Sequence, residues 1–266
     1  MRFAGGWWGP NLRQIRTCRA DTLGGVTLPR SVRFALWLSA WLDGSASTDD
    51  ARDGILAEDV AHDVSGLPGT SGAESLVLAF GPLRTLARSG AALALPVPGD
   101  PLGLAGPPDL NVAAIDVGEA VILPGADVAL LPHAVGAGVS WVAHPAQGPR
   151  QVPDLPEADR NLREAVLRAA ERLADLDVAR ARPDLADELQ SLRDPLDLRV
   201  PASLDGRVLR ALTLATRCCR IVTLARADDG AALTATEAEA RRSALVPLDH
   251  AARRAMVAAC EPRSGR

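Results

Sequence analysis

The stretch Leu131–His144, LPHAVGAGVSWVAH, decides the fold class. Two short apolar segments flank the glycine-containing centre Gly136-Ala137-Gly138. Glycine readily adopts the positive φ angles that tight hairpin loops require. The stretch therefore predicts a β-hairpin in the middle third of the chain.

Two registers are open for this hairpin. If residues 136–138 form a three-residue loop, His133 faces Trp141 and His144 lies on the opposite side of the sheet. A two-residue turn at 137–138 shifts the register by one residue and brings both histidines to one face. We favour the three-residue loop, because glycines at both of its ends suit positive φ angles.

Further short apolar runs surround the hairpin, separated by turns rich in proline and glycine. Such runs between turn signals are typical of β-strands. They are Ala91–Val97, Ala120–Leu123, Val128–Leu131 and Val139–Ala143. We expect a small antiparallel sheet, while Asn111–Gly118 fits either another strand or a short helix.

The segment before this sheet predicts two helices. Phe34, Trp37, Leu38 and Trp41 recur at helical spacing, so one helix begins near Ser31 and ends at residues 43–44. An acidic amphipathic helix then follows the polar turn 45–50 and extends through residue 63. Residues 75–89 fit an interrupted helix, or a strand followed by a short helix.

The segment after the sheet is helical. Helices are predicted around residues 162–176, 183–193 and 203–226, the last apolar nearly all round and therefore central. Pro247 is expected to split the final stretch into two helices that end near residue 260. The predicted fold class is α+β, with a C-terminal bundle of four to five helices packed on the sheet and the N-terminal helices.

Three parts of the chain are distinguished by composition and pattern. Residues 1–29 lack periodicity and are expected to form a poorly ordered leader. Residues 30–150 hold the helical pair and the sheet, and residues 151–266 hold the helical bundle. The second and third parts could also form one continuous globular unit.

The composition excludes several chemistries. The 266 residues contain no lysine and no tyrosine, so all 29 basic side chains other than histidine are arginine. A Schiff-base enzyme, a Walker-type nucleotide site and a phenol general acid each need one of these missing residues. The abundance of alanine, arginine, glycine and proline is typical of a GC-rich bacterial genome.

The charge and the cysteines indicate the cellular setting. A net charge of −4 without a basic block argues against general binding of nucleic acids. No apolar run is long enough to predict a membrane span or a secretory signal. The four cysteines form no CxxC pair and suit a reducing cytoplasm, where we expect the protein to be located.

The histidines and arginines supply one candidate ligand site. His133, Trp141 and His144 lie on the hairpin, and Arg217 and Arg220 lie on the central C-terminal helix. A pocket between sheet and bundle could combine these groups, with the arginines holding an anionic ligand. No sequence motif identifies a catalytic residue, and no cofactor is expected.

Two further candidate sites rest on helical spacing. Phe34, Trp37 and Trp41 form an aromatic stripe that anchors the core or, alternatively, docks a partner protein. Asp59 and His62 stand three residues apart, a spacing that di-metal helical bundles use, but the chain offers no second copy of it. A metal site at this pair is therefore only a weak alternative to the absence of a metal.

These observations favour binding over catalysis. Because every basic contact must be a guanidinium, which is a poor proton acceptor, proton transfer depends on four scattered histidines, the carboxylates and the cysteines. We expect a non-enzymatic interaction or regulatory protein, with a protein partner or a homodimer. The alternative is a small-molecule enzyme or binder with an anionic ligand between sheet and bundle.

Overall fold

The structure is a computed structural model that describes residues 27–148, 150–175, 196, 198–227 and 235–262. Most of the expected leader and the helix expected at 183–193 lie outside the described residues. Across the rest, seven helices and a six-stranded sheet confirm the α+β fold class.

The sheet is mixed rather than purely antiparallel. Its strand order is β2-β1-β6-β5-β4-β3, and β1 runs parallel to β6 while every other neighbouring pair is antiparallel. The strands are β1 (His62–Ser65), β2 (Glu74–Ser75), β3 (Ala92–Ala94), β4 (Ala120–Leu123), β5 (Val128–Val135) and β6 (Gly138–Pro145). The four strands from β3 to β6 lie within the predicted apolar runs or extend them, whereas the first two residues of β1 were expected to end a helix.

The β5–β6 hairpin adopts neither of the two predicted registers. Val135 pairs with Gly138, so the turn consists of Gly136 and Ala137. Gly136 supplies the positive φ angle, 58°, whereas a Cβ at Gly138 would lie 2.7 Å from the carbonyl oxygen of Ala61. A glycine is therefore needed at position 138 because the backbone of Ala61 lies too close to β6 for a side chain. The prediction that Gly138 belongs to the loop was wrong.

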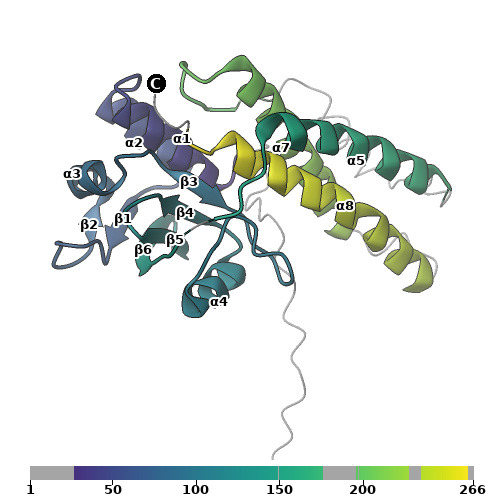
Figure 1. Ribbon diagram of the computed structural model, residues 1–266, viewed down its shortest axis with the longest axis horizontal. Coiled ribbons are helices and arrows are strands. Elements are labelled where there is room, and N and C mark those ends of the chain that lie inside the picture. The colour runs from purple at the N-terminus through teal and green to yellow at the C-terminus, as the bar shows by residue number, and fades with distance from the viewer. Residues whose placement is uncertain (1–26, 149, 176–195, 197, 228–234, 263–266) are drawn as a thin grey trace, which may run out of the picture.

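Helices cover both faces of the sheet (Figure 1). The helices α1 (Arg30–Leu42), α2 (Thr48–Leu56) and α3 (Leu76–Leu86) belong to the larger apolar core on one face. On the other face, Leu110 and Ala114 of α4 (Pro108–Val117) pack against alternate residues of β3, β4 and β5. The segment 111–118 is thus helical, which decides between the two alternatives left open by its pattern.

Two predicted helix boundaries differ from the structure. The α2 helix begins with a capping box between Ser47 and Asp50 but ends at Leu56, not at residue 63. The next residue, Ala57, has a φ angle of 46°, which a helix cannot accommodate, and the chain then enters β1. The acidic periodicity after residue 56 therefore belongs to a loop and a strand.

The C-terminal part contains three long helices in the described residues, α5 (Leu155–Asp175), α7 (Gly206–Ala227) and α8 (Ala235–Ala259). They lie side by side, beyond the β3 side of the sheet (Figure 1). The expectation that Pro247 splits the last helix was wrong, because α8 continues through it. None of the described helices is long and apolar enough to cross a membrane.

One apolar core joins the two parts. Phe34 and Leu38 of α1, Leu130 and Trp141 of the sheet, and Met256 of α8 belong to the same buried cluster. Contacts of α1 and α8 with β3 complete this junction. The C-terminal end of α8 is thereby held beside α1, where the candidate site lies.

Candidate functional site

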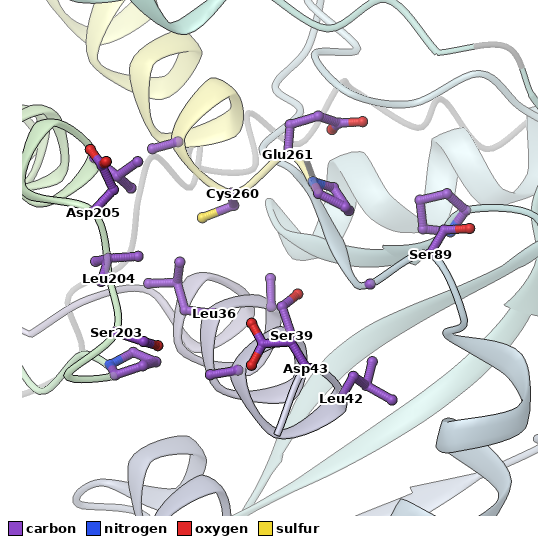
Figure 2. A pocket seen from close by; sticks show the side chains of 18 of the residues that line it. Leu36, Ser39, Leu42, Asp43, Ser89, Ser203, Leu204, Asp205, Cys260 and Glu261 are labelled. Carbon is purple, nitrogen blue, oxygen red and sulfur yellow. The ribbon is translucent and has the colours of Figure 1, made fainter. Parts of the chain in front are cut away.

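A cleft of about 740 Å³ lies at the junction of α1, α7 and α8. Figure 2 shows side chains of separate segments around it. The five segments are the second half of α1, the turn 88–90 before β3, Pro124 after β4, residues 201–208 leading into α7, and residues 259–262 at the end of α8. The cleft is therefore built by both the N-terminal and the C-terminal parts of the chain.

Short polar contacts hold the walls of the cleft in place. The Ser39 hydroxyl accepts a hydrogen bond from the backbone N–H of Ala91 (3.1 Å), which fixes the turn before β3 against α1. The Ser45 and Ser203 hydroxyls lie 2.8 Å apart and join the end of α1 to the loop before α7. The Asp205 carboxylate accepts from a backbone N–H in the first turn of α7, at 2.8 Å.

The charged groups of the cleft are mostly acidic. Asp43, Asp205 and Glu261 contribute carboxylates to the described lining, and Arg88 contributes the guanidinium. Arg150 stands outside the lining and binds both oxygens of Glu261, at 2.7 and 2.8 Å. The C-terminal ends of α1 and α8 add partial negative charge, and the N-terminal end of α7 adds partial positive charge. This balance is unfavourable for the anionic ligand that the sequence suggested.

The lining includes a thiol but no histidine among its described residues. Cys260 follows the last residue of α8, and Figure 2 shows its side chain at the α8 wall of the cleft. Burial, reinforced by the charge of Glu261, raises the pKa of the Cys260 thiol well above its ordinary value. The group therefore stays protonated near neutral pH and is a poor nucleophile.

The predicted ligand residues of the hairpin do not lie in this cleft. His133 and His144 share one face of the sheet, since their pairing partners are Ser140 and Ala129. Trp141 pairs with Pro132 and points to the opposite face, where it is fully buried. The structure therefore separates the tryptophan from the two histidines, and ligand binding by either group stays a prediction.

The two predicted arginines also lie away from the cleft. Arg217 and Arg220 are half-buried residues in the middle of α7, and both make polar or electrostatic contacts within the protein. The cleft contacts only the first turn of α7, at Val208, and the loop before it. The structure thus brings neither arginine together with the histidines of the hairpin.

The aromatic stripe of α1 is occupied by contacts within the chain. Phe34 is fully buried, with its ring centroid 4.6 Å from that of Trp141. Trp37 donates to the carbonyl oxygen of Arg199 at 3.2 Å, and Trp41 donates to the Thr48 hydroxyl at 3.0 Å. Both tryptophans are half-buried. These contacts support the core role and leave Phe34 no surface with which to dock a partner.

Asp59 and His62 do meet, though not on a helix. The Nε2 atom of His62 lies 3.1 Å from the Asp59 carboxylate, and its Nδ1 atom accepts from the indole N–H of Trp141 at 3.2 Å. Arg30 and Arg33 bind the same carboxylate. Both ring nitrogens and the carboxylate are therefore engaged, and the described residues contain no group of three or more side chains suited to a metal ion.

The residues that line the cleft were missed from the sequence. Asp43, Arg88, Asp205 and Glu261 stand at the ends of helices or in turns. In one sequence such residues resemble ordinary caps and solvent-exposed loop residues. Only the convergence of distant segments distinguishes them, and no local spacing carries that signal.

Comparison with known proteins assigns the two parts of the chain to matching domains. Residues 31–158 match the Rv1486c-like protein N-terminal domain, and residues 156–257 match the Rv1486c-like protein C-terminal domain. The cleft thus lies where segments of both domains meet, together with the few residues that follow the second match. No solved structure matches the chain.

Curated relatives come from mycobacteria, which agrees with the GC-rich bacterial composition. Uncharacterized protein Rv1486c of Mycobacterium tuberculosis (strain ATCC 25618 / H37Rv) is 31% identical over 286 aligned residues, which cover 84% of this chain and 98% of the relative. Uncharacterized protein MAV321 of Mycobacterium avium is 32% identical over 199 residues, covering 59% of this chain and 65% of the relative. By its two domain matches and its nearly full-length relative, the chain belongs to the Rv1486c-like family.

Proposed function

We propose that this protein is a non-enzymatic binding protein that holds a small, positively charged organic ligand in the junction cleft. The observation that carries the proposal is the cleft itself, about 740 Å³ in volume and lined by segments of both domains. That volume falls in the usual range for small-molecule sites, which often lie between domains. Binding there would couple the two domains to the presence of the ligand.

The charges of the lining favour a cation. Asp43 comes from the C-terminal end of α1 and Asp205 from the loop before α7, so the two carboxylates reach the cleft from different segments (Figure 2). An ammonium or guanidinium group placed between them would form charge-assisted hydrogen bonds. Leu36 and Leu204 provide apolar surface for the rest of the ligand. Arg88, at the rim, would exclude ligands with a second cationic end on that side.

The state of the reactive groups supports binding rather than catalysis. The His62–Asp59 pair has a His62 side chain with no exposed surface, so a ligand in solvent does not reach it. The thiol in the cleft, Cys260, is held in its protonated form by burial. A cytoplasmic location fits the three described cysteines, which are all free thiols.

The test is ligand-dependent stabilisation measured by thermal unfolding and then by calorimetric titration. We expect monoamines and guanidines to raise Tm, and we expect matched carboxylates not to do so. Asp205→Asn keeps the helix-capping oxygen but removes the charge, so it should weaken amine binding by about 10- to 100-fold. Asp116→Asn, at an exposed residue of α4, is the matched control and should leave binding unchanged.

Two outcomes would contradict this function. If no amine or guanidine of suitable size stabilises the protein, the cleft is not a cation site. If a ligand binds equally well to the wild type and to Asp205→Asn, it binds elsewhere. A protein partner or a homodimer remains a prediction from the sequence, to be checked by light scattering on the purified protein.

A further inference from the structure

A buried chain of hydrogen bonds joins the sheet to the start of α1. The indole N–H of Trp141 donates to Nδ1 of His62 (3.2 Å), and Nε2 of His62 lies 3.1 Å from Oδ2 of Asp59. Arg30 donates to both oxygens of that carboxylate at 2.8 and 3.1 Å, and Arg33 donates to Oδ2 at 3.0 Å. Three segments, β6, β1 and α1, are thus linked through one imidazole ring.

The partners of the ring define its protonation state. An indole nitrogen can only donate, so Nδ1 of His62 must offer a lone pair to Trp141. The proton of the neutral ring then sits on Nε2 and is donated to Asp59. A second proton could go only to Nδ1, where it would face the N–H of Trp141. Protonation therefore replaces one hydrogen bond with two opposed donors.

The charges around the ring also disfavour a second proton. Asp59 is the carboxylate that contacts the ring, and Arg30 and Arg33 already neutralise it. The next carboxylate, Glu119, is held by the hydroxyl and backbone N–H of Ser31 at 2.6 and 2.9 Å. A protonated His62 would add a third cation to this buried group. Only partial compensation would come from Asp59.

The pKa values follow from this environment. Burial lowers the pKa of His62 below its ordinary value, the contact with Asp59 opposes that effect, and Arg33 and Arg30 add to the lowering. Burial also favours the neutral form of Asp59, but hydrogen bonds from Arg30 and His62 lower the pKa of that carboxyl far below its usual range. Around pH 7 the network therefore consists of a neutral imidazole and an ionised carboxylate.

The helix held by this network is also a wall of the cleft. Arg30 and Arg33 lie in the first turn of α1, while Ser39 and Asp43, at its other end, line the cleft. The distance between the two sites is spanned by a single 13-residue helix. Loosening the first turn would therefore disturb the position of the cleft wall.

We propose that His62 is a proton-operated latch: protonation of its Nδ1 atom breaks the bond from Trp141, against whose ring Phe34 of α1 packs, and so favours a state in which α1 has moved away from the sheet and the junction cleft is open. The movement of α1 rests on the bond from Trp141 to His62 and on the packing of Phe34 against Trp141, because the bonds from Arg30 and Arg33 to Asp59 do not depend on the proton at Nδ1. The consequence for a ligand rests in addition on the function proposed above for the cleft. Acidification would then act as a release signal for the bound cation.

The pH range follows from linkage. In the latched state the pKa of His62 is depressed, and in the released state it returns to about 6.5. The released state thus binds more protons below pH 6.5, so the latch is fully stable above this value and weakens as the pH falls. Below pH 6.5, the equilibrium constant for opening should rise tenfold for each unit by which the pH falls, until the pH reaches the pKa that His62 has in the latched state.

Hydrogen exchange of the α1 amides, expressed as protection factors between pH 7.5 and 5, measures this opening directly and needs no ligand. We expect protection across α1 to fall with acid in the wild type, at both the Arg33 end and the Asp43 end. His62→Gln supplies an acceptor and a donor but does not titrate, so its α1 protection should stay constant. His133→Gln, at an exposed histidine, is the matched control and should behave as the wild type.

If the protection of the α1 amides in the wild type does not change with pH, the proposal is overturned. The same holds if acid lowers this protection equally in His62→Gln. Loss of protection confined to the first turn would overturn the coupling to the cleft. Should His62→Gln fail to fold, nitrogen NMR of wild-type His62 decides: the neutral Nε2–H form and a pKa below 6.5 support the latch, and a pKa at or above 6.5 refutes it. No amine is added in these experiments, so their results can be interpreted even if the cleft does not bind a cation.

Discussion

Replacing Gly54 by alanine tests whether Trp37 is fixed inside the protein. Gly54 is a buried residue of α2, and the Trp37 indole lies directly against it. A Cβ at this position would overlap the indole ring, so the ring would have to move. The same indole donates to the carbonyl oxygen of Arg199, which is part of the segment leading to α7.

The expected effect opposes the intrinsic preference of a helix. Alanine in place of glycine within a helix normally stabilises by about 1 kcal/mol. Overpacking of a filled site costs roughly 1–3 kcal/mol, and losing the bond to Arg199 costs about 0.5–1.5 kcal/mol more. Gly54→Ala should therefore lower the free energy of unfolding by roughly 0.5–3.5 kcal/mol.

Urea denaturation followed by circular dichroism measures this change. Gly206→Ala is the matched control, because a Cβ at this helical position would meet only Nη1 of Arg210, at an ordinary 3.5 Å. That variant should be as stable as the wild type or slightly more stable. If Gly54→Ala is also as stable as the wild type, the indole moves freely, and the assignment of Trp37 to the internal packing is refuted.

Three further substitutions test the core and the network. Phe34→Ala removes a fully buried ring that packs against Trp141 at a tilt of 53° and should cost about 3–5 kcal/mol in urea denaturation, whereas a partner-docking residue would leave stability unchanged. Arg253→Met removes the hydrogen bonds to the buried Asp249 carboxylate and to the carbonyl of Leu95, leaves Asp249, among the described residues, only its 3.9 Å contact with Arg226, and should cost about 3–5 kcal/mol. A neutral effect in the same assay would show that these Arg253 bonds are not needed for stability. Trp141→Phe removes the donor to Nδ1 of His62 and should lower the free energy of unfolding by about 1–3 kcal/mol at pH 7. It should also raise the pKa of His62 in an NMR titration. An unchanged pKa would show that the N–H of Trp141 does not oppose protonation of Nδ1.

The periodicity of apolar residues correctly predicted those helices and strands whose own residues determine where they form. The stripe of Phe34, Trp37 and Trp41 gives α1 because its apolar face is continuous, and the run Ala120–Leu123 matches β4 residue for residue. The hairpin was also evident, but its register was not. Register depends on Gly138, which is required by the neighbouring carbonyl of Ala61, a contact made by a segment far away in sequence.

The end of α2 shows the same limit. The acidic and apolar residues after Leu56 keep a helical period, yet Ala57 takes a positive φ angle and the chain turns into β1. The competing interactions are tertiary: His62 pairs with Val139 of β6 and bonds to Trp141. A strand partner from a distant segment thus outweighed a local propensity, which carries only a fraction of a kcal/mol per residue.

Asp59 and His62 illustrate how a correct contact can carry a wrong interpretation. Their spacing of three residues predicted proximity on a helix, and the two side chains do touch, but across a loop and a strand. The partners that define their chemistry, Arg30, Arg33 and Trp141, are 26 or more residues away from them in sequence. The sequence could therefore suggest the pair, but not that a buried, neutral His62 and a partly buried, ionised Asp59 lie there with all of their polar atoms bonded.

The position of α1 explains why the core and the candidate site cannot be separated by simple truncations. Its first turn binds Asp59, its middle stacks Phe34 on Trp141, and its last turns line the cleft. A substitution that removes Phe34 would thus alter ligand binding through stability alone. The charge-removing Asp205→Asn and the non-titrating His62→Gln avoid this difficulty, because each changes one charge or one proton while keeping the volume and the hydrogen-bonding pattern of the site.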